Sequence, residues 1–183
     1  MINSTVDISF PGMEGLKREI SSTAQRTELL NKWSDTYFQS MNARHNTLSK
    51  GVGSPDGQQW RSLAAATVDK RKRRLKSNTG TKPQRGPYAI LTDTLQLLAA
   101  TRKKGGPGQL RLFNVESFAA TLGIGGPTLY KDPTKRKTQR TLGTIAYYLA
   151  AKGRRIIVPP NARTVNKMET DAAIWVLKRK RGR

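Results

Sequence analysis

One stretch of the sequence, from Met13 to Leu48, contains no proline and, after Gly15, no glycine. Within it, apolar or neutral residues recur at steps of three, four and seven: Leu16, Ile20, Thr23, Thr27, Leu30, Trp33, Tyr37, Met41 and Leu48. This spacing places them on one side of a helix and predicts a single long amphipathic helix. At 1.5 Å per residue it would be about 50 Å long. Its apolar stripe could therefore face a neighbouring subunit or cover a sheet of the same chain.

Alternating apolar residues predict three strands. The first run lies near the N-terminus, at Val6, Ile8 and Phe10, before Pro11-Gly12. Two further runs, within residues 110–115 and 118–122, predict strands joined at Asn114–Ser117. A β-branched run, Ile156-Ile157-Val158, stopped by two prolines, predicts one more strand.

Shorter helices are expected near the C-terminus. Residues 142–153 read as the end of a strand that leads into a short helix, with Gly153 as its C-cap. A terminal helix is marked by Met168, Ala172, Trp175 and Val176. The fold class predicted is α+β: a long N-terminal helix and shorter helices packed on a small antiparallel sheet, with extended basic loops or arms, in a single domain over residues 1–183.

Residues 57–100 combine two apolar anchors with a basic span that is expected to be largely unstructured. Trp60 and Leu63 lie three apart and predict a helical face that continues to Thr67. Leu91, with Leu95 and Leu98, would anchor a second short helix capped by Thr92 or Asp93. The basic span begins with Lys70, Arg71, Lys72, Arg73 and Arg74. The predicted core residues with a structural role are Trp60, Leu63, Leu91 and Trp175.

The charge is distributed unevenly along the chain. Residues 1–59 hold six Lys/Arg and six carboxylates, so their net charge is zero. Residues 60–183 hold the other 28 Lys/Arg against six carboxylates and carry the entire net charge of +22. Because solubility needs a net charge of only about 2–8, the excess predicts a polyanionic partner: nucleic acid, an acidic protein surface or anionic lipid.

The basic excess is concentrated in extended arms, one within residues 57–100 and one within residues 127–142, and in a basic tail over residues 177–183. The second arm contributes five predicted DNA- or partner-binding residues: Lys131, Lys135, Arg136, Lys137 and Arg140. The first arm contributes Lys70 to Arg74. A polar loop of this length is usually either functional or disordered.

Catalysis is not expected. Cysteine is absent, His45 is the only histidine, and the carboxylates beyond residue 59 are scattered singly. These features predict no catalytic residues, no metal site and no cofactor. No apolar run approaches the roughly 20 residues that span a bilayer, and no secretory signal is recognisable, so we expect no membrane partner.

The order of several short motifs resembles a family of phage proteins. Gly57-x-x-Trp60-x-x-Leu63 is followed by a basic helix, by Ile-Leu-Thr-Asp-Thr at residues 90–94, by a hairpin, and by Leu-Gly-Thr and Tyr-Tyr-x-Ala-x-x-Gly within residues 142–153. This order resembles the virion-morphogenesis or tail-completion (head–tail joining) proteins of tailed bacteriophages, in the version that Mu-like phages carry, over roughly residues 10–178. The chain departs from that pattern at Leu95, where the family usually has glycine. It also lacks the His-Gln of the tyrosine element, and Arg155–Val158 stands where the family has Arg-Pro-Phe-Leu.

The resemblance implies a structural virion protein of the neck or upper tail, made in the host cytoplasm. It would form a homo-oligomeric ring, hexameric or dodecameric, that joins or completes the head–tail junction beside other neck, connector and tail-terminator proteins. Its basic arms would contact genomic DNA or acidic ring partners. The alternative from the residues themselves is a sequence-independent nucleic-acid-binding protein that is not part of the mature virion.

Overall fold

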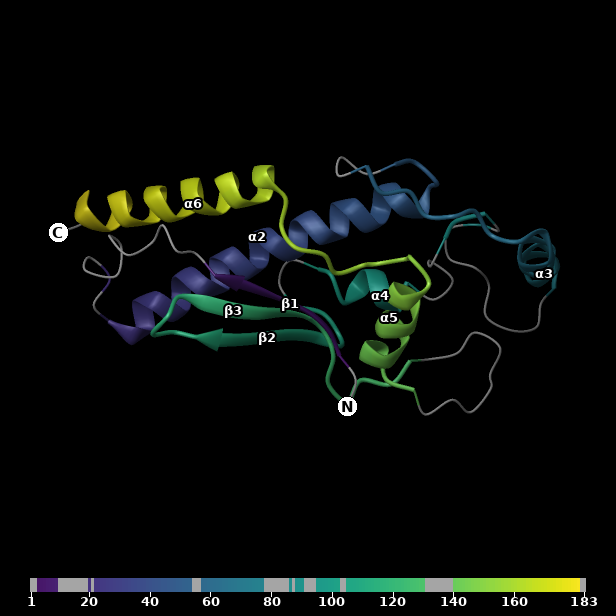
Figure 1. Cartoon of the computed structure of the whole chain (residues 1–183), viewed down its shortest axis with the longest axis horizontal. Coiled ribbons are helices and arrows are strands. Elements are labelled where there is room, and N and C mark those ends of the chain that lie inside the picture. Colours follow the sequence, from purple (N-terminus) through teal and green to yellow (C-terminus); the bar gives the residue numbers. More distant parts are fainter. Residues whose placement is uncertain are drawn as a thin grey trace.

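The computed structural model describes residues 3–9, 20, 22–53, 57–77, 86, 88–90, 95–102, 105–130 and 140–181. They form an α+β fold, as predicted, with a long helix and shorter helices around a small antiparallel sheet (Figure 1). The helices are α2 (Thr23–Ser49), α3 (Ala65–Lys76), α4 (Gln96–Ala99), α5 (Leu142–Ala151) and α6 (Ala162–Arg181). The strands are β1 (Ser4–Ser9), β2 (Gln109–Asn114) and β3 (Ala119–Ile124).

The sheet has the order β1-β3-β2, and both pairs are antiparallel. The predicted first strand and the predicted hairpin are therefore confirmed, although Phe10 lies outside the described residues. Ile8 of β1 and Leu122 and Ile124 of β3 are buried in the core. Gly123 allows β1 to approach β3, because a Cβ at this position would collide with the carbonyl oxygen of Ser4.

Helix α2 lies between the sheet and α6, which runs antiparallel to it (Figure 1). Because it is covered on two sides, its buried residues extend beyond one stripe and include Trp33, Tyr37 and Phe38. Opposite them, Met168, Ala172 and Trp175 of α6 are buried. The apolar stripe of the long helix is thus occupied by its own sheet and by α6.

The long helix begins later than the sequence predicts. Ser22 is its N-cap, and its side chain accepts a hydrogen bond from the backbone N–H of Gln25. Ile20 is buried in front of the helix, where its carbonyl accepts from Arg26 Nε at 2.8 Å. The helix has 27 residues, about 40 Å at 1.5 Å per residue. Residues 13–19, including Leu16, lie outside the described part of the chain.

In the β-branched run at residues 156–158, Ile156 and Ile157 are buried and Val158 is half-buried, but the run forms no strand, so that prediction is wrong. Side chains of α2 take the backbone carbonyls that a neighbouring strand would otherwise bond. Tyr37 Oη donates to the carbonyl of Val158 at 2.9 Å, and Arg44 Nη1 donates to that of Arg155 at 2.8 Å. Burial raises the pKa of Tyr37, so this hydroxyl keeps its proton at any physiological pH.

Two non-glycine residues have a left-handed backbone. Phe118 (φ 48°), at the end of the β2–β3 turn, is fully buried, with its ring 6.2 Å from that of Trp33 and the Arg26 guanidinium above it. Leu95 (φ 56°) is the N-cap of α4. Helix α4 is therefore shorter than the helix predicted around residues 91–98, whose first residues, Leu91 to Thr94, lie outside the described part.

The helical part of the prediction for residues 142–153 is confirmed, but the predicted strand end is wrong, because α5 begins at Leu142 itself. Thr141 caps α5 by accepting a hydrogen bond from the backbone N–H of Thr144 at 3.2 Å, and Gly153 (φ 75°) follows its last turn. Helix α6 forms as the expected terminal helix. It begins behind Asn161, whose side chain accepts from the N–H of Thr164 at 2.9 Å.

Candidate polyanion-binding surface

Helix α3 forms the end of the molecule farthest from the sheet (Figure 1). The prediction of a helix through Trp60 and Leu63 is wrong, because residues 58–64 are not helical and α3 begins at Ala65. The basic run that was expected to be largely unstructured is instead part of this helix. The residues that hold α3 to the rest of the chain are Val68 and Arg71, both buried.

Arg71 has a different role from its neighbours in the basic run. It is only 6% exposed, and its Nη1 donates to the carbonyl of Ala89. The sequence grouped it with the DNA- or partner-binding residues, but its guanidinium faces inward and anchors the helix. The exposed cations of α3 are Lys70, Lys72, Arg73 and Lys76; Arg74 is half-buried.

Hydrogen bonds bring a second basic segment beside the start of α3. Arg154 Nη2 donates to the carbonyl of Arg61 at 3.4 Å, and Gln58 Nε2 donates to that of Gly153 at the same distance. Residues 58–61 and 153–155 therefore lie side by side. The cations that this arrangement adds to the basic end are Lys50, Arg61, Lys152 and Arg155, all exposed.

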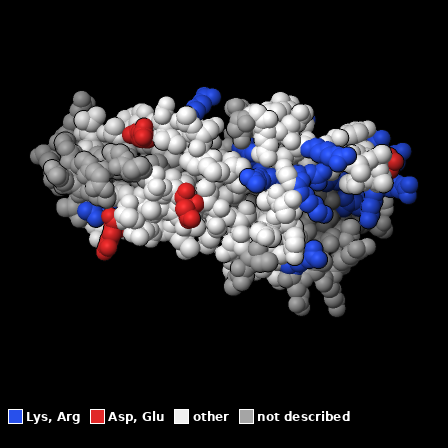
Figure 2. All heavy atoms as spheres, viewed as in Figure 1, with Lys and Arg blue, Asp and Glu red and all other residues white. Residues whose placement is uncertain are grey.

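These added cations were not assigned to a binding surface from the sequence, because Lys50 and Arg61 stand singly and Lys152 and Arg155 belong only to the short stretch Lys-Gly-Arg-Arg. Only the tertiary contacts between distant segments bring them to α3. Figure 2 shows the result as a concentration of Lys and Arg over the α3 end of the molecule. We name this surface the basic end, defined by the exposed cations of α3 together with Lys50, Arg61, Lys152 and Arg155.

Described carboxylates are concentrated at the opposite end (Figure 2). Asp69 is the only acidic residue of α3. The other described carboxylates lie on the sheet, its turn, α2 and α6: Asp7, Glu28, Asp35, Glu116, Glu169 and Asp171. Several of them pair with nearby cations, as Asp35 does with Arg111 at 2.8 Å. The charge of the described chain is therefore strongly polarised along its long axis, which favours an anionic partner at the basic end.

Tyr88 extends the basic end with an exposed aromatic ring. It is 65% exposed, and the Lys72 ammonium lies 5.3 Å from the ring centroid. A hydrogen bond with the Tyr88 side chain raises the pKa of Lys72, so Lys72 remains charged well above neutral pH. The cation–π contact holds one cation over the ring face.

A pocket of about 500 Å³ opens between α3, Tyr88 and the segment before α3. Its apolar lining is formed by Trp60, Leu63, Val68 and Ile90, and Lys50 and Arg61 lie at its edge. Trp60 is buried, as predicted, with its ring 5.3 Å from that of His45. Among the described residues, no acceptor bonds to its indole Nε1. Leu63 is half-buried against the core. The pocket therefore combines an apolar wall with a cationic edge.

Of the second predicted arm, only the two ends are described. The backbone N–H of Tyr130 donates to the carbonyl of Arg140 at 2.8 Å, and that of Leu142 donates to Thr128 at 2.9 Å. Arg140 is exposed and lies over the Tyr148 ring at 5.7 Å. Lys131, Lys135, Arg136 and Lys137 lie outside the described residues, as does Leu91.

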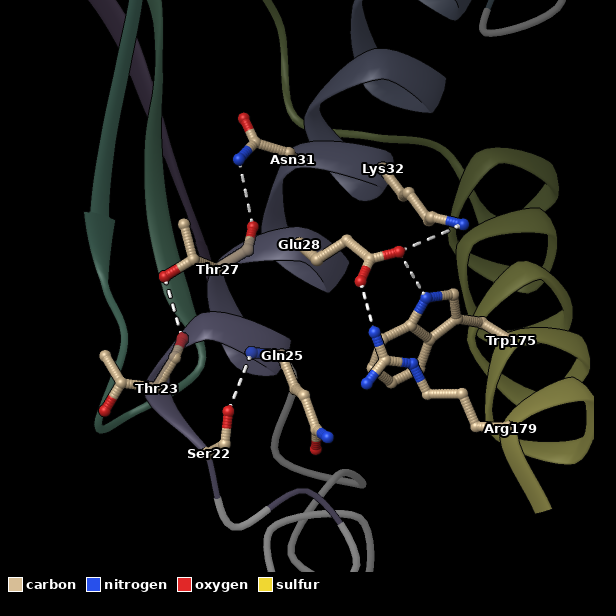
Figure 3. A network of polar contacts seen from close by, with 9 residues as sticks. All are labelled: Ser22, Thr23, Gln25, Thr27, Glu28, Asn31, Lys32, Trp175 and Arg179. Atoms are coloured by element: carbon tan, nitrogen blue, oxygen red, sulfur yellow. Dashed lines mark hydrogen bonds and ion pairs between the residues drawn. The ribbon is translucent and has the colours of Figure 1, made fainter. Parts of the chain in front are cut away.

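A separate polar network lies at the other end of the molecule, between α2 and α6 (Figure 3). Glu28 accepts from Trp175 Nε1 at 2.7 Å and from Arg179 Nη2 at 2.6 Å, and Lys32 Nζ lies 3.7 Å from it. The hydrogen bond from Trp175 lowers the pKa of Glu28, and the positive charges of Arg179 and Lys32 add to this effect. Trp175 is buried, as predicted. The network joins the two helices.

No group of three or more His, Asp or Glu within the described ranges lies close enough together to hold a metal ion. None of the described helices is long and apolar enough to cross a membrane. Comparison with protein-family models, with curated proteins and with solved structures gave no match.

Proposed function

We propose that the chain is a structural protein of a tailed-phage particle, in a ring at the neck or upper tail that joins or completes the head–tail junction. The observation that carries this proposal is the basic end, which includes the exposed cations of α3, in a chain of net charge +22. Such a surface suits a component that must bind DNA or the acidic face of a neighbouring protein.

The fold supports the same proposal. A long helix, shorter helices and a small antiparallel sheet are what the resemblance to tail-completion proteins implies. Leu95 adds a local point, because the family usually has glycine at this position and the backbone here is left-handed, a conformation that favours glycine. The departure from the family motif thus keeps the backbone shape that glycine would provide.

A ring requires head-to-tail contacts between copies whose rotation closes. The described chain has exposed apolar side chains that suit such contacts. They include Leu112 on β2, Tyr147 and Tyr148 on α5, and Ile174 and Leu177 on α6. A copy number of about 6 or 12 per particle would follow from a single closed ring.

The second candidate function is a sequence-independent nucleic-acid-binding protein outside the mature virion. The polarised charge and the exposed Tyr88 beside Lys72 favour it. It predicts binding to DNA of any sequence with an affinity that falls steeply with salt. The two candidates differ in whether the chain is retained in the particle.

The test is quantitative mass spectrometry of this chain in purified particles, with the major capsid protein as internal standard. A copy number that fits one ring supports the structural proposal, and native mass spectrometry of the purified chain then checks for the same ring in solution. Absence from particles, with a monomeric chain in solution, would reject the structural proposal and favour the nucleic-acid-binding one.

A further inference from the structure

We infer that the pocket beside α3 is a docking site for an acidic, extended segment of a partner protein that inserts one apolar side chain. This inference names the kind of partner that the basic end would take in the proposed function and rests on that function only for the partner's place in a particle. It also gives a role to the Gly-x-x-Trp-x-x-Leu motif, which supplies part of the pocket wall.

The pocket has an apolar wall. Leu63, Val68 and Ile90 surround it with aliphatic groups, and Trp60 completes the wall. A volume of about 500 Å³ accommodates one or two large side chains. Interfaces between proteins commonly place a buried apolar anchor in such a pocket, with a polar rim around it.

Cations surround this apolar wall. Lys50 and Arg61 line the pocket and are exposed, and Lys72 is held close by through its contact with Tyr88. Asp69 is the only carboxylate of α3, so a partner with carboxylates on either side of its anchor would meet mainly cations. Charge complementarity therefore selects an acidic partner.

The shape and lining of the pocket favour a protein segment over nucleic acid as its occupant. Duplex DNA presents phosphates and sugars along its backbone and has no projecting apolar group to fill the pocket. Single-stranded nucleic acid would need exposed aromatic faces for stacking. In the described part of this surface, Trp60 is only 2% exposed, so Tyr88 offers a single exposed ring where stacking of successive bases needs several. An apolar side chain fits the pocket better than a base does.

The probes are fluorescein-labelled peptides of one acidic sequence that differ only at a central residue: leucine, tryptophan or alanine. Their binding to the purified full chain is measured by fluorescence anisotropy at fixed salt. Because burial of one large apolar side chain contributes enough free energy for roughly a tenfold gain in affinity or more, the leucine or tryptophan peptide should bind at least about tenfold more tightly than the alanine peptide. Equal affinity of all three would overturn the inference, because it would show attraction by charge alone.

Ser62 offers a variant that fills the pocket without touching the core, since it lines the pocket and is exposed. Ser62→Trp should abolish the preference for the apolar peptides. Ser62→Glu, which adds a carboxylate at the rim, should lower the affinity of the chain for all three peptides. The matched control is Ser117→Trp in the exposed β2–β3 turn, which should change nothing. Retention of the preference in Ser62→Trp would also overturn the inference.

A charge-matched pair completes the design. Lys50→Gln with Arg61→Gln should weaken peptide binding, whereas Arg163→Gln with Lys178→Gln on α6 removes the same charge and should have a much smaller effect. Equal weakening by both pairs would count against the site. A different set of results would identify the surface as a phosphate site instead. Duplex DNA would displace the peptides and bind Ser62→Trp with the same affinity as the native chain, and the native chain would show no preference among the three peptides.

The outcome is independent of the particle measurement. Peptides that bind without preference, together with a ring copy number in particles, would remove the docking site and leave the proposed function standing. If the chain shows the expected peptide preference but is absent from particles, the docking site stands and the proposed function is rejected.

Discussion

Trp175 Nε1 donates a 2.7 Å hydrogen bond to a carboxylate oxygen of Glu28 and thereby joins the C-terminal part of α6 to the N-terminal part of α2 (Figure 3). The other carboxylate oxygen accepts from Arg179 at 2.6 Å. The Arg179 guanidinium also lies over the Trp175 ring, 4.3 Å from its centroid. One acidic side chain therefore fixes both an indole and a guanidinium of the neighbouring helix.

Glu28→Gln should lower the free energy of unfolding by about 1 kcal/mol, because it removes a charge-assisted bond that is partly exposed to solvent. Urea denaturation followed by circular dichroism measures this change. The control is Glu169→Gln, which removes an exposed carboxylate from α6, the helix that carries Trp175 and Arg179. It should change the free energy of unfolding by less than about 0.5 kcal/mol. Equal losses in the two variants would show that the α2–α6 contact does not depend on this carboxylate.

The lowered pKa of Glu28 predicts how stability depends on pH. In the folded chain this carboxyl titrates below its ordinary value of 4.5, mainly because of the hydrogen bond from Trp175. The unfolded chain therefore binds the proton more readily, and the contribution of Glu28 is present above that ordinary value and is lost as the pH falls through the lower, folded value. Unfolding free energies measured down an acid series should fall less steeply for Glu28→Gln than for the native chain. Parallel pH profiles would contradict the assignment.

The three tryptophans differ in what their indole N–H groups meet. Trp33 Nε1 donates to the carbonyl of Met168 at 2.9 Å, whereas the buried Trp60 Nε1 has no acceptor among the described residues. Replacement by phenylalanine removes ring volume at both sites, but only Trp33→Phe also removes a hydrogen bond. Trp33→Phe should therefore lower the free energy of unfolding by about 1 kcal/mol more than Trp60→Phe does. A larger loss for Trp60→Phe in denaturant titrations would contradict this order.

The elements that could be predicted from sequence are those in which the spacing of apolar residues along the chain matches the face that the folded protein buries. Residues 109–124 alternate and form a hairpin, and the periodic stretch before residue 50 forms α2. The start of α2 was missed because Ile20 continues the apolar period although it precedes the N-cap at Ser22. Burial of Ile20 comes from tertiary packing, which a local period does not report.

At residues 156–158 the local pattern predicted a strand that does not form. Ile156 and Ile157 are buried as in a strand, but Tyr37 and Arg44 of α2 bond the backbone carbonyls of Val158 and of Arg155, just before the run. Likewise, the basic end could be predicted only in its long basic run, Lys70 to Arg74. Lys50, Arg61, Lys152 and Arg155 join it through contacts between segments that are far apart along the chain.

Arg71 and Arg73, two residues apart on α3, should respond differently to the same substitution. Arg73 is exposed, so Arg73→Gln should lower the affinity for a duplex DNA probe and reduce the salt slope, log K against log salt, by about 0.9. Arg71 is 6% exposed and bonded to the carbonyl of Ala89, so Arg71→Gln should leave the slope nearly unchanged. It should instead speed amide hydrogen exchange in α3 by about tenfold, because a buried charge-assisted bond is lost.

Fluorescence anisotropy over a range of salt concentrations gives the slopes, and hydrogen-exchange mass spectrometry gives the protection of α3. Lys178→Gln on α6 is the control for the general loss of one positive charge, and it should affect neither measurement strongly. A reduced salt slope in Arg71→Gln without faster exchange would mean that this guanidinium reaches the polyanion directly. Faster exchange with an unchanged slope would establish that one arginine of the basic run holds the helix in place while its neighbours bind the partner.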